Sequence, residues 1–158
     1  FLEGYLWDEG DPKKAFDKAI ANSKKVAMSL SDLFCVERHK NHFLELVKTK
    51  LDIIFANEKE IMTLINAKSF DEAVSFSKEI KKNVIITRGG EGAIAISDNN
   101  IVEIRAKENL NIKDLTGAGD LFAAGYLHGV IHNLKIKECL EKGTELSSKI
   151  IQKIGARI

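Results

Sequence analysis

Apolar residues follow two alternating patterns along the chain. The stretches "KVAMSLS" (25–31) and "LDIIFAN" (51–57) are short, nearly continuous apolar runs. Such runs are typical of parallel β-strands that are covered on both faces. Between them, apolar residues recur at helical spacing over residues 35–49. The order strand, helix, strand predicts a right-handed βαβ unit.

The same alternation continues to the end of the chain. The stretch "GDPKKAFDKAIANSKK" predicts a helix with Asp11 as its N-cap and Pro12 in its first turn. Residues 83–106 predict a strand, a glycine turn and a hairpin across "SDNN". Further helices are expected at 58–66, at 70–82 and in two segments after residue 114. We therefore predict an α/β domain with helices on both sides of a parallel sheet.

Polar and glycine residues follow the predicted strands. Asn57 ends one strand, residues 87–92 follow another, and residues 114–120 precede a helix. Ligands of open α/β sheets bind beside the carboxyl ends of the strands. This convergence predicts one ligand site.

Composition narrows the class of protein. With 158 residues, 44% of them hydrophobic, the chain is long enough for one domain spanning residues 1–158. The net charge of +1 gives no basic field for nucleic acid or an anionic membrane. There is no apolar run of the roughly 20 residues that a membrane span requires, and two cysteines without a pairing pattern suit the cytoplasm. The apolar start "FLEGYLW", without Met, suggests the carboxyl-terminal part of a longer protein.

The stretch "DLTGAGDLFAAG" (114–125) has the composition of an anion site. Gly117 and Gly119 permit positive φ, so the amides of residues 117–120 are expected to lie free at the start of a helix. Free amides and the helix dipole bind anions such as phosphate. Asp120 would then accept a proton from an attacking hydroxyl group. The alternative is that Asp120 only complements the helix dipole.

Other nucleotide-binding motifs are absent. The sequence has no G-x-x-x-x-G-K-[ST] motif, and "RGGEGA" does not form a G-x-G-x-x-G motif after an opening strand. These absences exclude a Walker-type NTPase and weaken a Rossmann-type dinucleotide-binding module, which stays an alternative.

The chain resembles the ribokinase-like (PfkB) sugar and nucleoside kinases. "DLTGAGD" matches the family's D-T-x-G-A-G-D motif except at Leu115. "NEKE" (57–60) matches N-x-x-E, and "TRGGEG" (87–92) matches T-x-G-x-x-G. The tail "SSKIIQKIGAR" (147–157) is similar to the closing helix and Gly-Ala turn of the family. The resemblance implies a ribokinase-like three-layer αβα sandwich with a mostly parallel sheet.

The resemblance also implies roles for individual residues. Asp120 would be the general base, and Gly117, Ala118 and Gly119 would form the anion hole. The residues expected along ATP are Asn57, Thr87, Arg88, Gly89, Gly92, Gly119, Thr144 and Ser148. Asn57 and Glu60 would organise Mg²⁺ through water, and Asp114 with Thr116 would help to hold a monovalent cation such as K⁺.

Simpler interpretations of these residues stay open. The spacing of Asn57 and Glu60 also fits a helix capping box. Thr87 suits a strand end, "GGEG" suits a turn, and Asp114 suits the start of a turn.

The opening "LEGYLWD" and the ending "IGAR" resemble the adenosine kinase-like branch of the family. This branch implies transfer from ATP to the 5′-hydroxyl of adenosine, while ribose or fructose stays an alternative acceptor. The family is about twice as long, so we expect its amino-terminal half and β-lid to be absent here. The implied partners are a sugar or nucleoside, and either a separate amino-terminal half or a second copy; a catalytically incomplete remnant is a further alternative.

Cys35, His39 and His42 share one face of the predicted helix, at i, i+4 and i+7. A metal site would need a fourth ligand, which the sequence does not show. We therefore interpret Cys35 as a partly buried thiol and the histidines as solvated.

Overall fold

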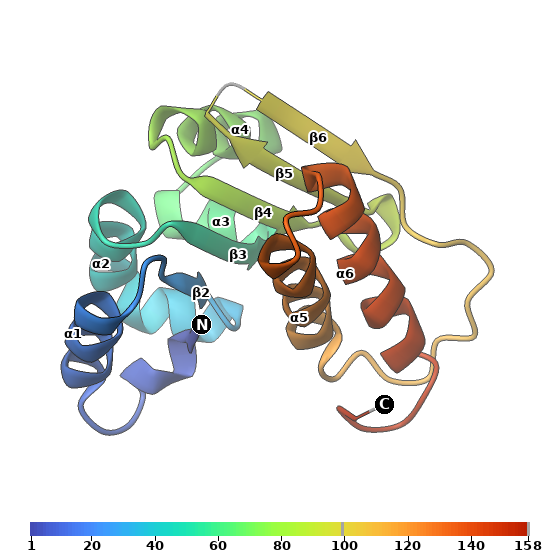
Figure 1. Ribbon diagram of the computed structural model, residues 1–158, viewed down its shortest axis with the longest axis horizontal. Coiled ribbons are helices and arrows are strands. Elements are labelled where there is room, and N and C mark those ends of the chain that lie inside the picture. Colours follow the sequence, from blue (N-terminus) through green and yellow to red (C-terminus); the bar gives the residue numbers. More distant parts are fainter. Residues whose placement is uncertain (99, 158) are drawn as a thin grey trace. The chain divides into compact units, whose positions relative to one another are not determined.

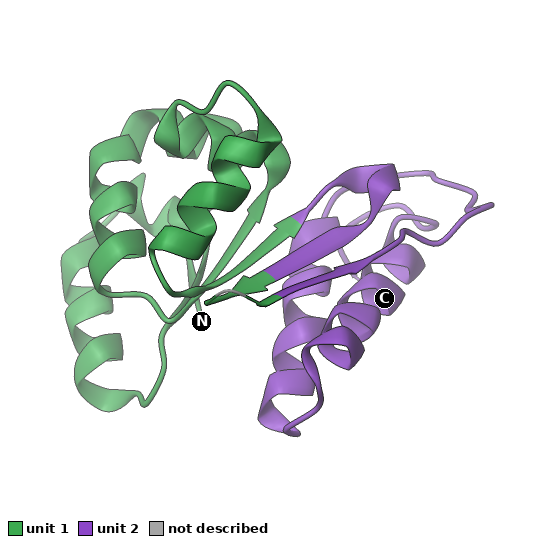
Figure 2. Cartoon of the chain, turned by 90° about the horizontal axis from the view of Figure 1, so that it is seen from above, with its two compact units in different colours: residues 1–86, 96–100 green, residues 87–95, 101–158 purple. Residues whose placement is uncertain are grey.

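The computed structural model describes residues 1–98 and 100–157. It divides into two compact units, which Figure 2 shows in different colours. Unit 1 comprises Phe1–Ile86 and Ile96–Asn100, and unit 2 comprises Thr87–Ala95 and Ile101–Ile158. Each unit is described here by itself.

Six strands follow one another in the sheet in the same order as in the sequence (Figure 1). They are β1 (Leu2–Glu3), β2 (Ala27–Ser29), β3 (Ile53–Asn57), β4 (Asn83–Thr87), β5 (Ala93–Ser97) and β6 (Asn100–Ile104). The β1–β2 and β2–β3 pairs are parallel, and Met28 lies opposite Ile54 in the register. The predicted α/β class with a mostly parallel sheet is confirmed. The connection between β5 and β6, predicted as a tight hairpin turn, includes residue 99, which lies outside the described residues.

The helices of unit 1 begin at the caps that their sequences provide. They are the 3₁₀ turn η1 (Gly4–Trp7), α1 (Pro12–Asn22), α2 (Leu33–Thr49), α3 (Glu58–Ile65) and α4 (Phe70–Glu79). The side chain of Asp11 accepts a hydrogen bond from the amide of Lys14, so the predicted cap of α1 is confirmed. Helix α4 is shorter than the predicted range because Lys81 takes a positive φ of 53°.

The core of unit 1 forms around β2 and β3. Met28 and Ile54 are fully buried on these strands, as the continuous apolar runs predict. One face of α2 is buried through Val36, Phe43 and Val47. Burying a side chain of this size stabilises the fold by about 1.5–3 kcal/mol. The apolar pattern therefore decides which face of α2 turns inward.

Unit 2 is held together by two helices in close contact, α5 (Ala118–Ile131) and α6 (Ile136–Ile150). A Cβ at Gly125 would lie 2.5 Å from the carbonyl oxygen of Lys142, and one at Gly143 would lie 2.8 Å from that of Phe122. Both positions therefore need glycine, because a side chain would push the helix backbones apart. No helix in the described part of the chain is long and apolar enough to cross a membrane.

The first turn of α3 contains a capping box. The Asn57 side chain accepts a hydrogen bond from the amide of Glu60, and a Glu60 carboxylate oxygen accepts one from the amide of Asn57, both at 2.9 Å. The Asn57 side-chain amide donates to the other Glu60 oxygen at 2.5 Å. Glu60 is only 5% exposed, and this burial raises the pKa of its carboxyl group to about 7. The capping-box interpretation of this motif is confirmed.

Replacing Gly125 with Ala should destabilise the chain by about 1–3 kcal/mol, because the new methyl group collides with the α6 backbone. Urea unfolding measures this loss. The matched control is Ala124→Gln at the exposed neighbouring position, which should change stability by less than about 0.5 kcal/mol. Equal stability of Gly125→Ala and the wild type would contradict the close approach of α5 and α6.

The stability of the chain should fall as pH rises from about 4.5 to about 7, because folding favours the protonated form of Glu60. The raised pKa corresponds to a loss of about 3 kcal/mol across this window. Glu60→Gln should remove this part of the pH dependence, as measured by urea unfolding at pH 5 and pH 8. Glu79→Gln, at an exposed acid, is the control and should keep the wild-type slope. An unchanged slope in Glu60→Gln would show that Glu60 titrates normally.

Candidate functional site: a cavity in unit 2

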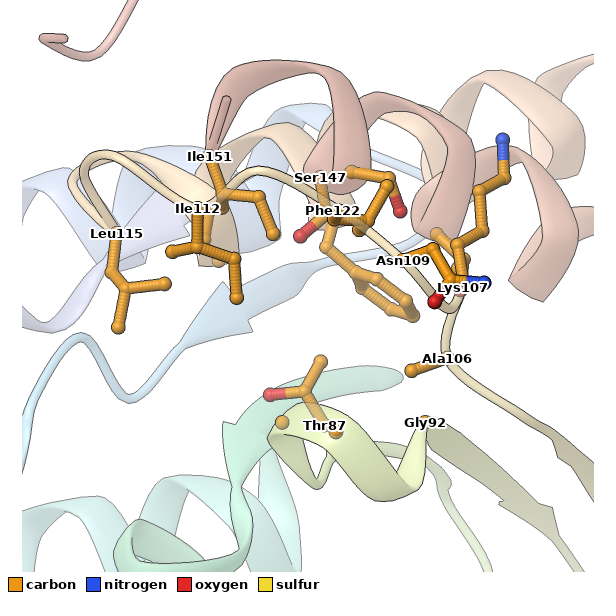
Figure 3. A pocket seen from close by; sticks show the side chains of 17 residues that line it. Thr87, Gly92, Ala106, Lys107, Asn109, Ile112, Leu115, Phe122, Ser147 and Ile151 are labelled. Atoms are coloured by element: carbon orange, nitrogen blue, oxygen red, sulfur yellow. The ribbon is translucent and has the colours of Figure 1, made fainter. Parts of the chain in front are cut away.

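A cavity of about 520 Å³ lies within unit 2 (Figure 3). Its wall comes from the end of β4, the turn that follows it, the segment before α5, and the facing sides of α5 and α6. The residues that line it are Thr87, Gly89, Gly90, Gly92, Ala106, Lys107, Asn109, Leu110, Ile112, Leu115, Ala118, Gly119, Phe122, Thr144, Ser147, Ser148 and Ile151. The volume is within the usual range of small-molecule sites, about 300–1,000 Å³.

The T-x-G-x-x-G stretch forms one wall of the cavity. Thr87 ends β4, and Gly89–Glu91 form the 3₁₀ turn η2. Gly92 has a φ of 104°, and a Cβ at this position would lie 2.0 Å from the carbonyl oxygen of Ile104. Only glycine fits there. Gly92 therefore lets the turn pack directly against the backbone at the end of β6.

Arg88, also predicted in this stretch, has a different position from Thr87, Gly89 and Gly92. It is not among the residues that line the cavity. Its guanidinium group forms an ion pair with Glu91 at 2.6 Å, and its amide donates to the carbonyl of Gly92 at 2.8 Å. These contacts hold the turn closed, which suits a structural role.

The opposite wall is polar at one end. Thr144 and Ser148 line it from α6, as predicted. Ser147, which the sequence analysis did not select, lies beside them, and the helical spacing from Thr144 could have identified it. Figure 3 shows Lys107 and Asn109 close to each other, and both line the same cavity. Both lie in a segment without regular structure, where no motif pointed to them.

The glycine turn before α5 has a left-handed start. Gly117, the N-cap of α5, has a φ of 77°. Ala118 donates its amide hydrogen to the carbonyl of Leu115 at 3.1 Å, so this amide is not free as predicted. Within the described residues, the amides of Gly117, Gly119 and Asp120 donate no hydrogen bond. Three of the four expected donors are therefore available at the positive end of the helix dipole.

Asp120 lies in the first turn of α5 and is exposed. It does not line the cavity itself, but it directly follows Ala118 and Gly119, which do. Its carboxylate has no hydrogen bond or ion pair with any described part of the chain. It is therefore available to a ligand that reaches the end of the cavity.

Asp114 lies at the other side of the same turn, and both of its carboxylate oxygens accept hydrogen bonds. One carboxylate oxygen accepts hydrogen bonds from the amide and the hydroxyl of Thr116, at 2.9 and 2.7 Å. The other accepts one from the amide of Gly155 at 2.8 Å. These donors, above all the Thr116 hydroxyl, lower the pKa of Asp114 to about 2. A permanently charged Asp114 thus connects the turn to the tail of the chain.

Comparison with known proteins identifies the family. The family model described as "pfkB family carbohydrate kinase" matches residues 5–158. The crystal structure of adenosine kinase from Sinorhizobium meliloti is 36% identical, with a TM-score of 0.94, and the match covers 99% of this chain and 49% of that one. A probable sugar kinase from Rhizobium etli CFN 42 is 34% identical, with a TM-score of 0.93, over 98% of this chain and 48% of that one.

A curated relative agrees with these structures. Adenosine kinase 1 of Arabidopsis thaliana is 29% identical over 155 residues, which cover 88% of this chain and 44% of the relative. The chain thus spans about half the length of the relatives that it matches. The sequence-based prediction of the family is confirmed, and the chain belongs to the pfkB family of carbohydrate kinases.

Proposed function

We propose that this chain is the nucleotide-binding and general-base part of an ATP-dependent kinase that phosphorylates a hydroxyl group of a nucleoside or sugar. The observation that carries the proposal is one cavity of unit 2 that both glycine motifs line. The T-x-G-x-x-G stretch contributes Gly89 and Gly92, and the GAGD turn contributes Ala118 and Gly119. A site for ATP needs such close backbone approach at both ends.

ATP would span the cavity from α6 to the amino end of α5. Adenine and ribose would lie near Thr144 and Ser148, and the phosphates would extend toward the amino end of α5. The free amides of Gly117, Gly119 and Asp120 would then stabilise the negative charge on the transferring phosphoryl group. Backbone donors suit this task because they are fixed before the reaction begins.

Two kinds of cation fit the proposal. Mg²⁺ keeps much of its hydration shell, so Asn57 and Glu60 would act on it through water. The charged carboxylate of Asp114, with Thr116, would help to hold a monovalent cation such as K⁺. In the chain as described, both pairs already make internal hydrogen bonds, which fix the orientation of their oxygen atoms.

The proposed step transfers one phosphoryl group. Asp120 takes the proton of the acceptor hydroxyl, and the hydroxyl oxygen forms a bond to the γ-phosphorus. The bond between the γ-phosphorus and the bridging oxygen breaks, and ADP leaves with its electron pair. The free carboxylate of Asp120 lies beside the amide donors, which supports the proposal that one turn provides both functions.

Adenosine is the proposed acceptor, and the reaction would give AMP and ADP. This choice rests on the similarity to the Sinorhizobium meliloti structure, named as an adenosine kinase. A sugar is the second candidate, because the Rhizobium etli structure of similar identity is named as a probable sugar kinase. The missing half of the family's length would supply acceptor contacts and the lid that excludes water. It would come from the same polypeptide, from a separate amino-terminal half, or from a second copy.

Asp120→Asn in the complete enzyme should lower kcat about 10²–10⁴-fold, because the amide cannot accept the proton. The dissociation constant for Mg·ATP should stay within about twofold, since the amide donors of the turn remain. Steady-state kinetics with adenosine and calorimetry with ATP measure the two quantities. Unchanged turnover would remove Asp120 as the base.

Thr144→Trp should prevent ATP binding to the chain, because the larger side chain fills one end of the cavity. Calorimetry with Mg·ATP should show at least a tenfold loss of affinity. The control is Lys137→Trp, an exposed position of the same helix that does not line this cavity. Equal affinities of the two variants would place the nucleotide elsewhere, and tighter binding of NAD than of ATP to the wild type would favour a dinucleotide-binding module.

A further inference from the structure

Three potential metal ligands come together in unit 1, away from the residues used above. They are Asp8, at the end of η1, and Cys35 and His39, one turn apart on α2. Their ligand atoms all lie within 4.8 Å of one another. His42, the third residue of the sequence pattern, is not part of this cluster. The third member of the cluster is therefore Asp8 and not His42. Asp8 lies outside α2, so the helical spacing of α2 could not reveal it.

The separations are close to those of a coordinated ion. Zn²⁺ binds sulfur at about 2.3 Å and nitrogen or oxygen at about 2.0–2.2 Å, so its ligand atoms lie about 3.3–3.7 Å apart. The Nε2 atom of His39 lies 2.7 Å from an Asp8 carboxylate oxygen. An ion between them would need this pair to open by less than 1 Å. The α2 backbone leaves helical geometry at His39, with φ −115° and ψ 18°, which turns this ring away from its regular helical position.

Arg38 would hold the Asp8 carboxylate in position and would not compete with the metal ion for it. Its Nη2 atom donates to one Asp8 oxygen at 2.6 Å, and its Nε atom donates to the other at 3.0 Å. The first contact can remain while the second oxygen, which already faces His39, binds an ion. Carboxylate ligands of metals commonly accept such additional hydrogen bonds. Arg38 also contributes to lowering the pKa of Asp8, which keeps this ligand ionised.

The cluster has a closed side and an open side. Cys35 is fully buried, whereas the side chains of Asp8 and His39 are 28% and 18% exposed. An ion can therefore enter from solvent past the two outer ligands. Burial raises the pKa of Cys35 to about 11, so without metal it is a neutral thiol whose proton is released to solvent when the sulfur binds an ion.

We propose that Asp8, Cys35 and His39 form a three-ligand site for a divalent transition-metal ion, with water as the fourth ligand. A set of one sulfur, one nitrogen and one oxygen donor favours Zn²⁺ or Co²⁺ over Mg²⁺ or Ca²⁺. The ion would tie the segment after η1 to the first half of α2.

Titration of the purified metal-free chain with Co²⁺ tests this site. We expect one equivalent to bind and to produce the near-ultraviolet absorption of a thiolate bound to cobalt, and Zn²⁺ should displace it. Cys35→Ala should lose this absorption. His39→Gln, at a partly exposed position that does not threaten folding, should weaken binding at least tenfold.

His42→Gln is the matched control, since this histidine lies on the same helix and outside the cluster; it should bind as tightly as the wild type. The absence of thiolate absorption in a folded wild-type chain would overturn the proposal and leave Asp8, Arg38 and His39 as an ion-pair network alone. Equal loss in His39→Gln and His42→Gln would overturn it as well. Circular dichroism of each variant confirms folding.

Discussion

The candidate site depends on the left-handed conformation of Gly117. With a φ of 77°, this residue turns the chain from the loop of Asp114 into α5, and a Cβ there would lie 3.0 Å from that of Ala156. The turn leaves three amides at the amino end of α5 without a partner in the described chain. The tail around Gly155, held by Asp114, packs close to the same turn and thereby fixes it. The start of α5, the amides available at its amino end and the position of the tail thus depend on one backbone conformation.

The distance between α5 and α6 determines the width of the cavity. Phe122 lines it from α5 and Thr144 from α6, and each lies within three residues of a contact glycine, Gly125 or Gly143. A side chain at either glycine would push α5 and α6 apart. The two cavity walls that these helices form would then separate as well. Residues that do not line the cavity therefore determine how wide it is.

The sequence predicted the fold well because its signals are local. Buried parallel strands and capped helices each leave a pattern within about ten residues. The wall residues Thr87, Gly92, Thr144 and Ser148 were selected by the resemblance to a known family, and all four line the cavity. The prediction was less accurate where a residue's role depends on a contact that no spacing encodes. Nothing in the sequence showed that the amide of Ala118 donates a hydrogen bond to the carbonyl of Leu115, or that Arg88 forms an ion pair with Glu91.

The irregular segment 105–113 was missed for the same reason. Lys107 and Asn109 belong to no strand, helix or turn motif, yet both line the cavity. Asp8 is a similar case, because its approach to Cys35 and His39 joins segments that lie about thirty residues apart in the sequence. Periodicity finds neighbours on one element, whereas contacts between elements need coordinates.

Two aspartates in one short turn have different surroundings. Asp114 accepts three hydrogen bonds and has a pKa of about 2, so it stays charged and immobile and is a poor proton acceptor. Asp120 has no partner among the described residues, so no internal hydrogen bond must break before it accepts a proton. The difference follows from where the donors lie: the amide of Gly155 and the amide and hydroxyl of Thr116 reach the Asp114 carboxylate, whereas no donor in the described chain reaches that of Asp120. For this reason we propose Asp120, and not Asp114, as the general base.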